Sequence, residues 1–133
     1  MKNIYYQIWT DCIASFKKNN KDWKWKSMLY MNISMAFNVM FVFYFLGKLF
    51  SVFKKYQIEI DIFYGTSLDA LIEYIILYGL PIHLLNYFLI FYNRKYETLL
   101  ACYPHYSGKY FIVYFMISLG LPFLGVTIYF FNQ

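Results

Sequence analysis

The chain has 133 residues, of which 61% are hydrophobic, 26% are aromatic and only 14% are charged. A soluble domain is about 45–50% apolar and about 25% charged, and one of this length could not bury so much apolar surface. The net charge of +5 comes from basic residues that flank long apolar runs, which indicates anionic lipid headgroups as the partner and excludes nucleic acid.

Residues 1–27 form a segment that precedes the first apolar run. Within residues 3–16, apolar side chains recur every three or four positions, which is typical of an amphipathic helix. We expect this helix to lie in the cytoplasmic interface with its apolar face toward lipid, or to dock that face on a partner helix. The expected interfacial anchors are Trp9, Trp23, Trp25, Lys24 and Lys26.

Three apolar runs, residues 28–46, 68–92 and 110–131, are long enough to cross a hydrocarbon core, which takes about 20 helical residues. The first and third contain no Asp, Glu, Lys, Arg or His. The three runs together predict a three-span membrane domain over residues 28–133. The expected fold class is all-α: three transmembrane helices after an amphipathic interfacial helix, with a short extended segment in the outer loop.

The distribution of Lys and Arg predicts the orientation of the chain. Nine basic residues precede the first run or lie between the second and third, against three on the opposite side. Basic loops stay in the cytoplasm, so we expect a cytoplasmic N-terminus and an outer C-terminus in the bacterial cytoplasmic (inner) membrane. Cys12 and Cys102 then lie on the cytoplasmic side, where we expect free thiols.

The outer loop has a strand-like pattern. Residues 57–62 alternate polar and apolar side chains, with Ile58, Ile60 and Ile62 on one side. A lone strand must pair with an edge on a partner protein, lie in the interface or remain irregular. After it, Thr66 and Asp69 have the spacing of a capping box that opens the second run.

Polar side chains within the runs are the candidate contacts between helices or with a partner. Such groups usually hydrogen-bond across helices. We expect Glu73 to stay in the outer headgroup layer near Lys48, or to face a donor on a partner. The predicted contact residues are Asn32, Ser34, Asn38, Glu73, His83 and Asn86.

The second and third runs share a Gly-Leu-Pro sequence near their centres. Gly79 with Pro81, and Gly120 with Pro122, predict a bend in each helix, because proline lacks the backbone donor that the helix needs. Matched interruptions can also mark a midplane binding site in transporters built from repeats. We favour bends that shape helix packing.

The sequence contains no catalytic constellation, metal-ligand set or cofactor fingerprint that we recognise, so we expect a protein that is not an enzyme. The aromatic helix faces are too numerous for three helices to satisfy one another. We therefore predict an accessory or structural subunit of a larger membrane complex, with membrane lipids and other integral membrane proteins, or copies of itself, as partners. The alternative is a self-oligomerising pore lined by Asn32 and Asn38 or by Glu73 and His83.

In size, topology and composition, the chain resembles the small basic membrane proteins that confer immunity to pore-forming bacterial toxins. Those proteins also have about three spans with few charges inside. The resemblance implies a protein that is harmless alone and binds the membrane helices of a toxin.

Overall fold

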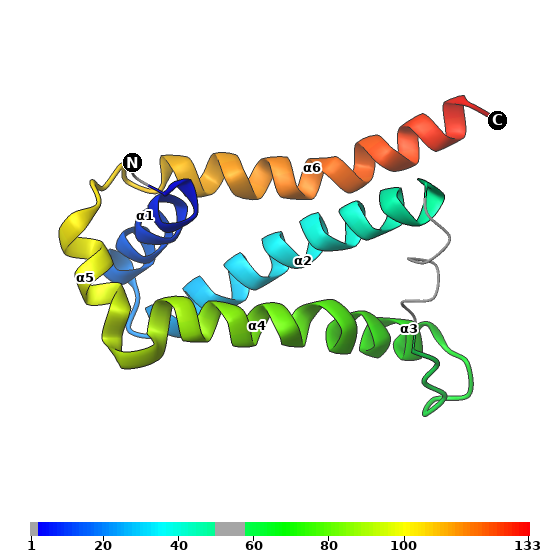
Figure 1. Cartoon of the computed structure of the whole chain (residues 1–133), viewed down its shortest axis with the longest axis horizontal. Coiled ribbons are helices and arrows are strands. Elements are labelled where there is room, and N and C mark those ends of the chain that lie inside the picture. The colour runs from blue at the N-terminus through cyan, green and yellow to red at the C-terminus, as the bar shows by residue number, and fades with distance from the viewer. Residues whose placement is uncertain (1–2, 50–57) are drawn as a thin grey trace.

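The computed structural model describes residues 3–49 and 58–133, and this part of the chain is helical with no strand (Figure 1). Two of the three basic residues expected on the outer side, Lys54 and Lys55, lie outside the described residues, as does Gln57 at the start of the alternating segment. The elements in chain order are α1 (Ile4–Asn19), α2 (Trp23–Leu49), α3 (Ser67–Tyr74), η2 (Ile75–Gly79), α4 (Leu80–Asn86), η3 (Tyr87–Phe91), η4 (Tyr92–Arg94), α5 (Lys95–Cys102) and α6 (Lys109–Phe131).

Three helices are long and apolar enough to cross a membrane: Trp23–Lys48, Ser67–Cys102 and Lys109–Phe131. We call these candidate membrane helices span one, span two and span three. The prediction of an all-helical chain with three such helices is confirmed. Span one begins before residue 28, because Trp23 and the lysines that follow it already belong to the helix.

Span one lies between the other two spans and contacts both (Figure 1). At one end of the molecule, α1 packs against α2, α5 and α6. We call this the α1 end. The opposite end, which we call the loop end, carries residues 58–66. The short helix α1 therefore holds the spans together at one end only.

The middle of α1 is buried in the bundle. Trp9 and Ile13 are fully buried in the main apolar cluster, together with Met31, Ile90 and Phe111 of the spans or their ends. Polar Gln7, Thr10 and Asp11 are buried as well. This differs from the expected interfacial helix, and Trp9 has none of the exposure that an interfacial anchor needs.

The start of α6 depends on a side chain from α1. One carboxylate oxygen of Asp11 accepts the backbone N–H groups of Tyr106 (2.8 Å) and Gly108 (3.0 Å). The other oxygen accepts those of Tyr110 (2.9 Å) and Phe111 (3.4 Å). A helix start leaves such donors unpaired and favours negative charge, so Asp11 caps α6 across about a hundred residues of sequence.

The same junction requires glycine at position 108. Gly108 precedes α6 in the left-handed region, with φ 83°, and a Cβ there would lie 3.0 Å from the hydroxyl oxygen of Ser15. A side chain would therefore strain the backbone and push α1 away. The close approach of α1 to this turn places Asp11 within reach of the four amides.

The helical structure of span two continues through Pro81. A π-helical turn, η2, ends just before Pro81, with the Leu80 N–H donating to the Ile75 carbonyl. In membrane helices, such local π adjustments satisfy backbone groups that a proline leaves without a donor. A second π turn, η3, follows, and the chain then turns at Asn93 and Arg94, which both have positive φ. Pro122 lies inside the continuous helix α6.

We predict that Asp11→Asn lowers the free energy of unfolding by about 3 kcal/mol, because the amide group would face backbone donors and leave buried N–H groups unpaired. Reversible unfolding in mixed micelles measures this loss. Asp22→Asn is the matched control, since Asp22 is exposed and, among the described residues, only its backbone carbonyl is bonded, to the Lys26 N–H. Equal stability of the two variants would contradict the capping role of Asp11.

Candidate partner-binding surfaces of the spans

A chain of hydrogen bonds links α1 with spans one and two. The Tyr5 hydroxyl donates to Asn86 Oδ1 at 2.7 Å, and Asn86 Nδ2 donates to Asn32 Oδ1 at 2.7 Å. Asn32 Nδ2 then lies 2.8 Å from His83 Nδ1. The structure thus brings together three of the predicted contact residues, Asn32, His83 and Asn86. We call the side chains of Tyr5, Asn86, Asn32 and His83 the relay.

Members of the relay differ in their burial. Asn86 is fully buried, and Tyr5 is partly buried. Burial raises the pKa of Tyr5 to about 12, so its hydroxyl keeps its proton at physiological pH. His83, by contrast, is exposed on span two.

Asn38 contacts span three. Its Nδ2 donates to the hydroxyl oxygens of Tyr114 and Ser118, both at 2.9 Å. Its Oδ1 is buried without a hydrogen-bond donor among the described residues. Ser34 is buried but donates to the Tyr30 carbonyl of its own helix, so it forms no hydrogen bond between helices. Of these two predicted contacts, only Asn38 joins different spans by a hydrogen bond.

At the loop end, two carboxylates hold the backbone of the preceding loop. Glu73 accepts the N–H of Ile60 at 2.9 Å. Asp69 accepts the N–H groups of Ile62, Phe63 and Gly65 at 3.0–3.1 Å. Residues 58–62 are therefore irregular and not a strand, because carboxylates of span two already bind amides that a partner edge would need.

Only half of the expected capping box forms at this end of span two. Thr66 forms no side-chain cap, and the Asp69 N–H donates to the Thr66 backbone carbonyl. The Asp69 carboxylate does engage the Thr66 backbone N–H, together with three other loop amides. The loop thus folds onto the first turn of span two.

Lysines and aromatic rings form a cluster at the α1 end. Lys24 Nζ lies 5.5 Å from the Trp23 ring centroid and 5.2 Å from that of Tyr96. Lys26 donates to Asn20 Oδ1, and Trp25 is 65% exposed. Cations over aromatic faces, with exposed rings beside them, are typical of a membrane interface.

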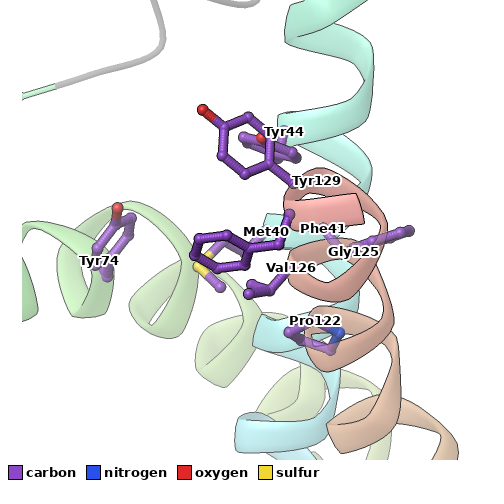
Figure 2. Close-up of a pocket in the computed structure, with 9 residues that line it drawn as sticks. Met40, Phe41, Tyr44, Tyr74, Pro122, Gly125, Val126 and Tyr129 are labelled. Carbon is purple, nitrogen blue, oxygen red and sulfur yellow. The ribbon is translucent and has the colours of Figure 1, made fainter. Parts of the chain in front are cut away.

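Toward the loop end, the spans separate around an apolar crevice of about 390 Å³. Figure 2 shows side chains from α2 and α6 on one side and Tyr74 of α3 on the other. Its lining residues are Met40, Phe41, Tyr44, Tyr74, Pro122, Gly125, Val126, Tyr129 and Phe130.

Predicted kink residues lie near this crevice or along the same helices. Pro122 lines it, while a Cβ at Gly120 would meet nothing within 4 Å. Gly125, which the sequence analysis did not single out, lets α6 approach span one, since a Cβ there would lie 3.1 Å from Phe41. Gly79 closes the π turn before Pro81.

Sequence reasoning missed Asp11 and Tyr5. The amphipathic pattern placed Tyr5 on the apolar side of an interfacial helix and Asp11 on its polar side, yet each hydrogen-bonds with groups more than 80 residues away.

Among the described residues, no group of three or more His, Cys, Asp or Glu side chains could hold a metal ion. Comparisons of the chain with known protein families, curated proteins and solved structures gave no match.

We predict that Tyr5→Phe lowers the free energy of unfolding by about 1 kcal/mol. The substitution removes the hydroxyl that donates to Asn86 Oδ1, so this buried oxygen loses that hydrogen bond. Tyr6→Phe is the matched control, since no hydrogen bond of the Tyr6 hydroxyl is observed among the described residues. Unfolding in mixed micelles compares the two variants. A loss of equal size in both would show that the relay contributes nothing specific.

Proposed function

We propose that this chain is a non-catalytic, multi-pass membrane protein that acts by lateral association of its helices with another membrane protein, as an accessory or structural subunit of a larger complex. The observation that carries the proposal is the open packing of the spans. In the most apolar window of each span, 11%, 17% and 11% of the residues are buried within the chain.

The crevice supports the same proposal. It opens between spans that are joined at the α1 end, and large aromatic side chains such as Tyr129 and Phe130 remain about half or more exposed beside it. Association of membrane helices depends on close packing and hydrogen bonds. A partner helix seated against this crevice would gain packing contacts that the three spans leave unused.

The contacts of Asn38 and Glu73 favour association over a pore. A pore formed by several copies would need these polar groups to face a shared wet path. Asn38 instead donates both of its amide hydrogens to span three, and Glu73 binds a loop amide of its own chain.

We further propose that the α1 end faces the cytoplasm of a bacterial cell and that the membrane is the cytoplasmic one. Support comes from the excess of Lys and Arg at that end and from the lysine and aromatic cluster around Trp23. Cys102 at the end of α5 is exposed and provides a probe of this orientation, while Cys12 is buried.

We predict that a membrane-impermeant maleimide modifies Cys102 only when it has access to the cytoplasmic face, and that Cys12 reacts only after unfolding. Burial raises the pKa of the Cys12 thiol, and the thiolate is the reactive form. A Cys102→Ser variant, which should stay unmodified while folded, is the control. Modification of Cys102 in intact cells with a permeable outer membrane would reverse the proposed orientation.

Purification in mild detergent tests the function itself. We expect the tagged chain to leave its native membrane with another integral membrane protein in fixed stoichiometry, which mass measurement of the intact particle and identification of its components would reveal. A particle made solely of copies of this chain, or a lone chain, would contradict the proposal.

Two valines of α6 provide matched variants for that purification. Val126 lines the crevice, whereas Val113 is exposed to a similar degree nearer the α1 end and does not line it. We predict that Val126→Trp fills the crevice and lowers recovery of the partner at least about tenfold, which corresponds to about 1.4 kcal/mol. Val113→Trp should leave recovery unchanged, and equal effects would exclude the crevice as a contact.

A further inference from the structure

One open face of span two combines apolar and polar side chains. Ile76, Leu80, His83, Leu84 and Tyr87 are all exposed, and their spacings of three and four residues place them along one side of the helix. We call these residues the His83 strip. In lipid, exposed leucine needs no partner, but an exposed polar group does. His83, unlike the leucines and isoleucine of the strip, therefore needs a hydrogen-bond partner.

The relay determines which nitrogen of His83 carries the proton. Tyr5 donates to Asn86, and Asn86 donates to Asn32 Oδ1, so the Asn32 amide nitrogen is left to donate to His83 Nδ1. An accepting Nδ1 has no hydrogen, so the neutral ring has its hydrogen on Nε2. That Nε2–H has no acceptor among the described residues, and it belongs to an exposed side chain.

The depth of His83 excludes a lipid headgroup as the acceptor. Trp23, Phe91 and Tyr96 contact one another at the α1 end, where the lysine and aromatic cluster marks the interface. His83 precedes Phe91 by eight residues, which is at most about 12 Å along the helix, because an α-helix rises about 1.5 Å per residue and the π turn Tyr87–Phe91 rises less. Since half of the hydrocarbon core is about 15 Å thick, His83 lies near the midplane.

A second copy of the chain would not satisfy this donor. Two copies inserted in the same direction and related by a two-fold axis along the membrane normal present the same residue at the same depth. In a contact of the His83 strip with itself, His83 would lie beside His83 of the other copy, and both would offer an N–H. Such a symmetric contact leaves the donor unsatisfied, whereas a different chain with an acceptor at that depth satisfies it.

We propose that the His83 strip is the docking surface for a membrane-spanning helix of a different protein, whose contact face is apolar apart from a hydrogen-bond acceptor near the midplane. This inference rests on the proposed function and specifies its partner. His83 Nε2–H donates to an acceptor such as a serine, asparagine or glutamine side-chain oxygen, while Leu80 and Leu84 pack beside it.

The test places a photoreactive amino acid at Leu80 of the full chain and, as a control, at Ile117, which is exposed on span three. Irradiation of native membranes should give one adduct with a different protein from position 80 and none from position 117. His83→Leu should lower the adduct yield by about 3- to 18-fold, the range expected for one hydrogen bond between membrane helices. His83→Gln, which keeps a donor, should retain the adduct.

Folding of each variant is checked by protection of Cys12 from maleimide. A second measurement, the nitrogen-15 spectrum of His83 in a His105→Gln background, should show hydrogen on Nε2 and none on Nδ1. A charged ring, or hydrogen on Nδ1, would overturn the inference without depending on His83→Leu.

The remaining outcomes separate this inference from the proposed function. An adduct of two copies of the chain, or a yield unaffected by His83→Leu, overturns the inference. Absence of an adduct from position 80 while a partner still co-purifies overturns it as well, and the proposed function stands. Absence of both an adduct and a co-purifying protein overturns both.

Discussion

The carboxylate of Asp11 fixes the arrangement on which the other contacts depend. It accepts backbone N–H groups on both sides of the turn that starts α6, and it is fully buried. A buried carboxylate is stable only when its oxygens are hydrogen-bonded, and the first turn of a helix provides donors in a compact array. Because Asp11 lies on α1, this contact draws α1 into the bundle and away from a purely interfacial position.

The position of α1 has consequences along the whole length of the spans. With α1 packed against α2, α5 and α6, the apolar cluster around Trp9 and Ile13 fills the α1 end. Tyr5 of the same helix reaches Asn86 and starts the relay through span one. Toward the loop end, the crevice between α2, α6 and Tyr74 stays open. The chain therefore has one well-packed end and one open end.

Hydropathy was sufficient to predict the three long helices, because their length and apolar composition depend on local sequence alone. The pairing of Asn32 with His83 and Asn86 depended on which faces of two helices meet, and sequence could only nominate these residues as candidates. The capping role of Asp11 could not be predicted from the sequence, since its partners lie 95–100 residues away and its neighbours on α1 fit an ordinary amphipathic pattern. The isoleucine alternation predicted a strand. In the structure this segment is an irregular loop whose amides bind the carboxylates of Asp69 and Glu73.

Hydrogen bonding discriminates among the surfaces of such a chain better than hydrophobicity does. Lipid tails solvate leucine and phenylalanine as well as another helix would, so the large exposed apolar area does not by itself identify a contact. Polar groups at the midplane have no such alternative. Asn38 donates its amide hydrogens to span three, and Glu73 binds a loop amide. His83 differs from both, because the relay contacts its Nδ1 while the residue remains exposed on span two.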